Sequence, residues 1–350
     1  MDPVRRSVNI LELITVPPAI SKGDYSITVC LHGQVTGNHG LPQTRLREIM
    51  AFADHFRALF LRQASPEMVE MVMTSVGIEL FDTWLAPCWE TLRQRLKPGE
   101  TTLLSLRSPV PEIVHLPWEL LLPPDGLPWG RDCNRCIRRR GGDPGQPVRF
   151  SHDLQHPPLQ TVIHVATQHE DAHALRVAFQ TMAKSITAPL SISVEPTGSF
   201  NGWVREVKHW QPHLVILQGT TMVRSGRGFF LFADEEGQAD PKTGDEIMEQ
   251  VLENTRVGCL IVCGRDLDHP PPWSATALLA DDLARGGIPL TVAWPDRVHE
   301  GPGFVFLAAF LDALAHGATI DAALHRGGDL MARQANPNRQ ISWSIPMIFQ

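Results

Sequence analysis

The chain has 350 residues, enough to bury one large hydrophobic core or two smaller ones. Its formal net charge of −7 at pH 7 argues against a nucleic-acid-binding protein, which would normally be basic. No apolar run reaches the roughly 18 to 20 residues of a membrane helix, and residues 1–6 lack the apolar core of a signal peptide. We therefore expect a cytoplasmic protein whose six cysteines are reduced.

The first part of the chain combines strand and helix patterns. β-Branched residues predict strands, and apolar residues at helical spacing predict helices. The expected elements are a strand at 26–31, helices at 44–63 and 66–96, and a strand at 101–107. The second helix is expected to break at either Gly77 or Pro87.

Arginine, glycine, proline and glutamine dominate residues 131–158. This composition predicts a linker between a first domain at 1–150 and a second at 155–350. Within it, the basic run Arg138–Arg140 is interpreted either as a solvated loop or as a docking patch for an acidic partner or nucleic acid.

The second part of the chain alternates strand and helix patterns. Strands are predicted at 161–166, 190–194, 214–217, 259–263 and 290–294, and helices at 169–184, 198–210, 244–254, 274–286 and 304–316. The strands at 214–217 and 259–262 are almost wholly apolar, as strands buried on both faces are. The pattern predicts an α/β fold with a mainly parallel sheet covered by helices on both faces.

The run His115-Leu116-Pro117-Trp118-Glu119-Leu120-Leu121 resembles the LPWE signature of the CHAT family of caspase-like peptidases. The segments 317–324 and 342–346 resemble two further pieces of that family's pattern, and the resemblance spans about residues 70–350. It implies a caspase-like second lobe preceded by an N-terminal α/β lobe. It also implies protein partners, among them a TPR-containing or bacterial defence-system protein.

The resemblance further implies a Cys–His dyad beyond the carboxyl ends of two neighbouring strands, where reactive groups of open α/β sheets collect. The family's Gly-His-Gly is matched here by Gly219-Thr220-Thr221. Thr220 cannot replace the histidine, because its hydroxyl does not exchange protons near neutral pH. The cysteine position is open between Cys263, which ends a predicted strand, and Arg265, which an ungapped alignment of that strand places there.

Two loop histidines, His269 and His299, are the alternatives for a general base. His164 is expected to be a core residue because its neighbours are apolar. The positive charge of Arg265 could favour a thiolate at Cys263, but a guanidinium cannot act as the general base that accepts the thiol proton. Asp234 and Glu235 either line a pocket for a basic residue or form an exposed turn.

A separate set of residues has the spacing of a structural zinc site. It consists of Cys133-x2-Cys136 followed, after fifteen residues, by His152-x3-His156. The segment between them lacks the apolar residues of a zinc finger's small core, so chance spacing is the competing interpretation. No other cofactor is expected.

Three functions follow from the sequence. The first is a pseudo-peptidase that lacks its dyad and acts as an interaction or regulatory module in a bacterial defence or regulated-proteolysis assembly. The second is an active cysteine endopeptidase using Cys263 with an unusual histidine base. The third is a binding module stabilised by zinc.

Overall fold

A computed structural model describes residues 8–20, 23–61, 65–97, 99–124, 126–141, 159–166, 172–186, 190–252, 255–266, 274–294, 302–333 and 346–350. The chain divides into two compact units, residues 1–147 with 336–344 and residues 148–335 with 345–350.

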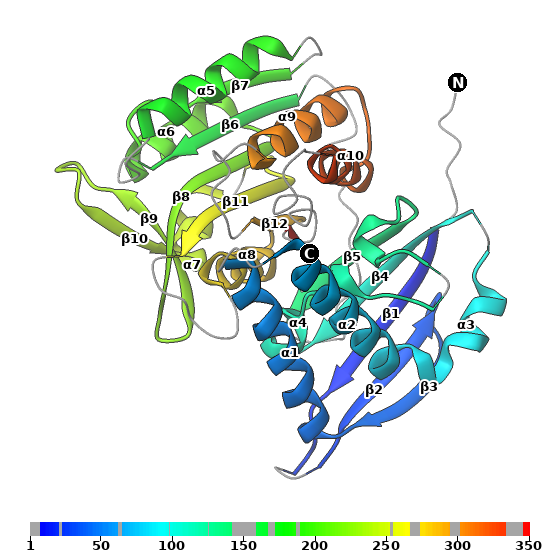
Figure 1. Ribbon diagram of the computed structural model, residues 1–350. Helices are drawn as coiled ribbons and strands as arrows, with labels where there is room; N and C mark the ends of the chain where they lie inside the picture. Colours follow the sequence, from blue (N-terminus) through cyan, green and yellow to red (C-terminus); the bar gives the residue numbers. More distant parts are fainter. Residues whose placement is uncertain are drawn as a thin grey trace. The chain divides into compact units, whose positions relative to one another are not determined.

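The first unit is built on a five-stranded sheet in the order β5-β4-β1-β2-β3 (Figure 1). Its strands are β1 (Val8–Val16), β2 (Tyr25–Leu31), β3 (Gln34–Leu41), β4 (Thr101–Ser108) and β5 (Arg135–Gly141). Its helices are α1 (Gln43–Leu61), α2 (Pro66–Trp84), α3 (Trp89–Arg95) and α4 (Pro111–Val114), with short 3-10 turns η1 (Ala86–Cys88), η2 (Trp118–Leu120) and η3 (Trp129–Arg131). Strands β1, β4 and β5 run parallel, whereas β1, β2 and β3 form an antiparallel meander.

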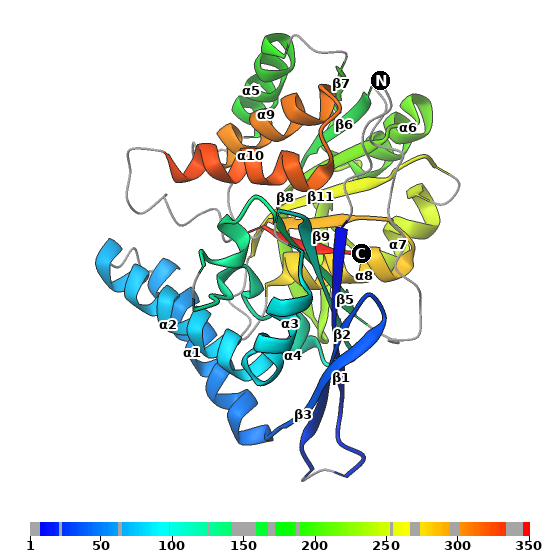
Figure 2. The ribbon, with the colours of Figure 1, turned by 90° about the vertical axis from the view of Figure 1, so that its right-hand side faces the viewer.

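Helices cover one face of this sheet. Strand β1 alternates buried and more exposed side chains, with Leu11 and Leu13 fully or almost fully buried. Figure 2 shows α1, α2, α3 and α4 on a single side of β1, β2 and β3. The predicted break at Pro87 is confirmed: α2 ends at Trp84, and the proline lies in η1.

The linker predicted from residue 131 is wrong for residues 135–141, which form strand β5 beside β4. The basic run Arg138–Arg140 is therefore not a solvated loop. Arg139 is fully buried, and its guanidinium donates to both carboxylate oxygens of Glu119, at 2.6 and 2.5 Å. It also donates to the carbonyl oxygens of Val114 and Leu116, so β5 is held to the LPWE turn.

The second unit contains a larger, mainly parallel sheet. Its strands are β6 (Leu159–Val165), β7 (Leu190–Val194), β8 (Leu214–Arg224), β9 (Arg227–Ala233), β10 (Ala239–Thr243), β11 (Cys259–Asp266), β12 (Thr291–Trp294) and β13 (Met347–Phe349). Strands β7, β6, β8, β11 and β12 lie side by side and parallel, and β13 is antiparallel to β12. The antiparallel β9–β10 hairpin pairs with the second half of β8.

Helices cover both faces of this sheet. They are α5 (Ala172–Ser185), α6 (Phe200–Trp210), α7 (Gly244–Ile247), α8 (Ala275–Gly286), α9 (Pro302–Ala315) and α10 (Ile320–Ala332). Figure 2 shows α5, α9 and α10 on one side of β6 and β8 and α6 on the other. The predicted α/β fold, a mainly parallel sheet with helices on both faces, is confirmed.

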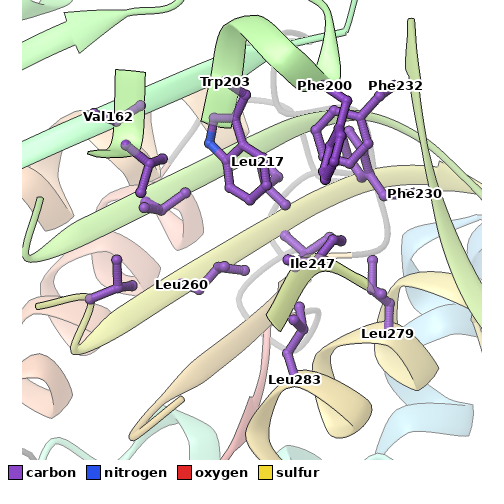
Figure 3. Close-up of a cluster of buried hydrophobic side chains, with 14 of the residues drawn as sticks. Val162, Phe200, Trp203, Leu217, Phe230, Phe232, Ile247, Leu260, Leu279 and Leu283 are labelled. Carbon is purple, nitrogen blue, oxygen red and sulfur yellow. The ribbon is translucent and has the colours of Figure 1, made fainter. Parts of the chain in front are cut away.

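One hydrophobic cluster fills the face covered by α6 and α8 (Figure 3). Trp203 of α6 stacks on Phe232 of β9, with ring centroids 5.3 Å apart. Beneath these rings lie Leu217 of β8 and Leu260 of β11, both fully buried. The apolar strands recognised in the sequence thus form the centre of the second unit.

Two predicted elements differ in extent. Strands β8 and β11 continue past the apolar runs to Arg224 and Asp266, because their later residues pair with each other and with β9. The helix expected at 244–254 is a short α7 continued by a π-helical turn, Met248–Leu252. Among the described residues, no helix is both long and apolar enough to cross a membrane.

Candidate functional site

Strands β8 and β11 bring together Thr220 and Arg265, two positions at which the resemblance would place a dyad. The dyad was expected beyond the ends of the strands, but Thr220 lies inside β8, because β8 continues into its pairing with β9. The strands are parallel neighbours, and their register pairs Thr220 with Arg265 and Gln218 with Cys263. Thr220 is half-buried, and it also pairs with Leu231 of β9 on its other side. The residue across from Thr220 is therefore Arg265, whereas Cys263 lies two residues earlier on its strand.

Cys263 is completely buried in β11. Burial in an apolar environment raises the pKa of its thiol well above the ordinary value, because the charged thiolate loses its hydration there. Its neighbours in the sheet are Gln218 on one side and Trp294 on the other. Neither side chain can accept a proton from the thiol, so this arrangement holds Cys263 in the thiol form.

His164 lies on the opposite face of the sheet from Cys263. Its ring is 5.0 Å from that of Phe232, a member of the α6-side cluster. Side chains alternate along a strand, and Val262 of β11 belongs to the same cluster, so the neighbouring Cys263 points away from it. Trp294, the sheet neighbour of Cys263, instead packs against Phe306 of α9, with ring centroids 4.5 Å apart. The prediction that His164 is a core residue is confirmed.

His164 Nδ1 is 3.2 Å from Oε2 of Glu195, which follows β7. Burial lowers the pKa of His164, so the ring is neutral at pH 7. Burial also raises the pKa of Glu195, but the adjacent His164 ring and the hydrogen bonds from Thr197 outweigh it and bring the value to about 2. The Glu195 carboxylate additionally accepts the backbone N–H groups of Thr197 and Gly198, at 2.7 and 2.6 Å. This buried pair organises the turn that leads into α6.

Glycines allow close packing beside both dyad positions. A Cβ atom on Gly219 would lie 2.7 Å from the ring of Phe230 and 2.9 Å from the Ala166 side chain. A Cβ atom on Gly264 would lie 2.4 Å from Oγ1 of Thr276 on α8. The Thr276 hydroxyl is 2.9 Å from that of Thr221, so a pair of threonines fills the space above Gly264. No local sequence pattern indicates this contact, because the threonines lie 55 residues apart.

The other predicted site residues fall into two groups. His269 and His299 lie outside the described residues, and of Arg265 only the backbone is described. Asp234 and Glu235 form the turn between β9 and β10, where the Asp234 carboxylate accepts the Gln238 N–H at 2.7 Å. Glu235 is exposed at this turn and lies 3.5 Å from the side-chain amide of Asn201 on α6.

Only half of the predicted zinc set can be placed. Cys133 is exposed in the turn before β5, and Cys136 is buried in that strand. The two histidines at 152 and 156 lie outside the described residues. Within the described ranges, no three His, Cys, Asp or Glu side chains gather in a metal-binding arrangement.

No protein-family model matches the chain, and no curated protein matches it. Among solved structures, the chain is similar to separase in the separase–securin complex of Saccharomyces cerevisiae, with a TM-score of 0.50 and 9% sequence identity. The similarity covers 98% of this chain and 30% of that one, so the chain spans less than a third of its neighbour's length. At this identity the likeness is one of fold alone. The second unit's parallel sheet and this similarity together support a caspase-like α/β fold.

Proposed function

We propose that this chain is a CHAT-type, caspase-like pseudo-peptidase that acts as an interaction or regulatory module in a bacterial defence or regulated-proteolysis assembly. The observation that carries the proposal is the pairing of Thr220 of β8 with Arg265 of β11. Threonine and arginine occupy the sequence positions at which the family's histidine and cysteine are expected. Neither side chain exchanges a proton near neutral pH, and a guanidinium is not a nucleophile.

The burial of Cys263 supports the same proposal. Thiol chemistry requires a thiolate and therefore a lowered pKa, which a neighbouring base or cation normally supplies. Burial shifts the pKa of the Cys263 thiol in the opposite direction. His164, a buried histidine of the same sheet, belongs to the cluster on the other face.

A caspase-like chain without a working dyad is expected to act by binding. We propose other proteins as its partners, including a TPR-containing protein or another component of a defence system. The structural neighbour is itself described in a complex with securin, which gives a precedent for a protein partner on a related fold.

A hydrolysis assay on the full chain tests the proposal. We expect no turnover of a mixture of peptides that covers every residue type before the scissile bond. The Cys263→Ala variant should be indistinguishable from the natural sequence in this assay. Hydrolysis that disappears in Cys263→Ala would replace the proposal with an active cysteine peptidase, and His269→Ala and His299→Ala would then identify its base.

A reconstruction experiment tests the assignment of the two positions. In Thr220→His with Arg265→Cys, an imidazole and a thiol occupy paired positions, so the imidazole should lower the thiol's pKa. We expect faster alkylation of the new thiol at pH 7 than in Arg265→Cys alone. The matched control is Gln218→His with Arg265→Cys, in which the imidazole lies two residues earlier on β8. Equal alkylation rates in all three variants would contradict the assignment.

A further inference from the structure

We propose that the exposed face of α2 binds a basic amphipathic helix of a partner protein. Three apolar side chains of α2 are exposed to solvent: Met68 (46%), Met71 (63%) and Ile78 (45%). Their spacing of three and then seven residues places them on one side of the helix. We call these three residues the α2 stripe. At 1.5 Å per residue, the stripe extends about 15 Å along the helix.

Helix α2 is fixed before any partner binds. Its N-terminus is capped by Ser65, whose hydroxyl accepts the backbone N–H of Met68 at 3.4 Å. The opposite face of the helix lies in the core of the first unit, where Val76 and Leu80 are almost completely buried. A partner would therefore meet a preformed surface, which lowers the entropy cost of association.

The one polar residue within the stripe does not interrupt it. Ser75 lies between Met71 and Ile78, and its hydroxyl donates to the backbone carbonyl of Met71 at 3.0 Å. Because this donor is satisfied inside the helix, covering it with a partner leaves no donor unpaired. The two methionines have flexible side chains that adapt to the shape of an apposed surface. The stripe is therefore suited to contact with another protein.

Phe52 of α1 extends the apolar surface. Helices α1 and α2 lie side by side (Figure 1), and Arg45 near the start of α1 pairs with Glu79 near the end of α2, so the helices are antiparallel. Phe52 lies two turns after Arg45, on the same side of α1, and is 42% exposed. A partner helix laid along α2 can therefore contact both helices.

The charges of α2 favour a basic partner. The helix contains four carboxylates and no lysine, arginine or histidine. Glu79 is paired with Arg45. The other three, Glu67, Glu70 and Asp82, are exposed and form no ion pair with any described residue. Lysine or arginine side chains beside the apolar stripe of a partner helix would complement these carboxylates.

The same charges disfavour other occupants of the stripe. A second copy of the chain would bring the unpaired carboxylates of two α2 helices together, and like charges across an interface are repulsive. An anionic membrane surface would be repelled in the same way. The inference deepens the proposed function and rests on it in taking the occupant to be a partner protein.

The test is fluorescence anisotropy of a labelled helical peptide titrated with the full chain. The peptide carries leucines at helical spacing with lysines beside them. One control peptide has glutamates in place of the lysines, and a second has the same composition with the leucine spacing scrambled. We expect the lysine peptide to bind at least about tenfold more tightly than either control, because it alone matches both the stripe and its carboxylates.

The contribution of the stripe is measured with Met71→Ala combined with Ile78→Ala, since alanine preserves the helix. This variant should weaken binding of the lysine peptide about tenfold or more. The matched control is Val177→Ala with Leu330→Ala, which truncates two exposed apolar side chains of the second unit. It should leave the dissociation constant within about twofold.

The contribution of the charges is measured with Glu67→Lys combined with Glu70→Lys. This variant should reverse the preference, so that the glutamate peptide binds more tightly than the lysine peptide. Its matched control is Glu236→Lys with Glu249→Lys, which makes the same charge change at two exposed positions of the second unit. The control should retain the preference for the lysine peptide.

Three results would overturn the inference: equal binding of the three peptides, an unchanged preference after the change at residues 67 and 70, or no saturable binding up to about 1 mM chain. Dimerisation of the natural chain in sedimentation velocity, abolished by Met71→Ala with Ile78→Ala, would instead assign the stripe to a second copy. The hydrolysis assay reads the proposed function separately, so the two proposals can fail independently.

Discussion

Arg139 and Glu119, twenty residues apart, form a two-pronged ion pair inside the first unit. The pair joins the glutamate of the LPWE turn to the central arginine of β5. The remaining N–H groups that contact this turn donate to backbone carbonyls, so the guanidinium is satisfied on several sides. The most recognisable motif of the sequence is therefore a structural element of the first unit.

Replacing Glu119 with glutamine is expected to destabilise the first unit by about 3 kcal/mol or more, because it leaves the buried charge of Arg139 without its counter-charge. Urea denaturation followed by tryptophan fluorescence measures this change. In Glu119→Gln with Arg139→Met, the buried charge is gone as well, so the loss should be clearly smaller than the sum of the two single losses.

The control for this prediction is Glu90→Gln. Glu90 forms an exposed pair with Arg93 in the same unit, so the free energy of unfolding should hardly change. Equal destabilisation by Glu90→Gln and Glu119→Gln would show that the buried pair has no special role.

Adding one methyl group at Gly264 should destabilise the second unit by about 1–3 kcal/mol, because the new Cβ would overlap the hydroxyl of Thr276. Thermal denaturation measures the loss. Combining Gly264→Ala with Thr276→Ala and Thr221→Ala removes the two hydroxyl-bearing side chains next to the new methyl group. This triple variant should recover part of the lost stability. The matched control is Gly40→Ala, where the new Cβ would lie 3.5 Å from its nearest neighbouring atom, an ordinary contact distance. A loss at Gly40 as large as at Gly264 would contradict the close packing at the strand end.

Acid should destabilise the second unit through His164. Because burial lowers the pKa of this histidine, the unfolded chain binds the proton more readily than the folded chain. Stability is therefore lost as the pH falls below about 6.5, with a slope of at most about 1.4 kcal/mol per pH unit from this group. Glu195, with a pKa of about 2, retains its contribution until the pH falls below its unfolded value of 4.5.

The variant His164→Gln separates these contributions. Glutamine can still donate to the Glu195 carboxylate but does not titrate, so its free energy of unfolding should fall less between pH 7 and pH 5 than that of the natural sequence. Urea titrations at several pH values measure both slopes. Identical slopes for the two chains would remove His164 as a source of acid sensitivity.

Cysteine alkylation should follow burial. Cys133 is exposed, whereas Cys263 is fully buried with a raised thiol pKa. We expect iodoacetamide at pH 7.5 to modify Cys133 first and Cys263 only after denaturation. Peptide-level mass spectrometry over a time course measures both rates in the same sample, so Cys133 serves as the internal control. Modification of Cys263 as fast as that of Cys133 would contradict the description of its surroundings.

The sequence predicted the second unit better than the first. Apolar runs such as 214–217 and 259–262 mark strands buried on both faces, and the structure places them at the centre of the sheet. Strand β5 was missed because an Arg-rich run is locally typical of a loop. The Glu119 contact that allows Arg139 to be buried is long-range, and no local pattern reveals it.

The candidate site was predictable only in part. The absence of a histidine at residue 220 is plain from the sequence. The sequence leaves the cysteine position open between Cys263 and Arg265. The register that pairs Thr220 with Arg265 is set by hydrogen bonding across the sheet, so no local pattern reveals it. The burial of Cys263 and its separation from His164 likewise depend on which face each strand presents.

The Glu119–Arg139 pair also bears on where the first unit can be cut. A fragment ending before Arg135 would lack β5 and would leave the Glu119 carboxylate enclosed without a counter-ion. Such a piece should be trapped in a partly folded form or degraded, even though it contains the whole LPWE motif. Dissection of this protein by truncation must therefore keep residues 135–141 with the segments that precede them.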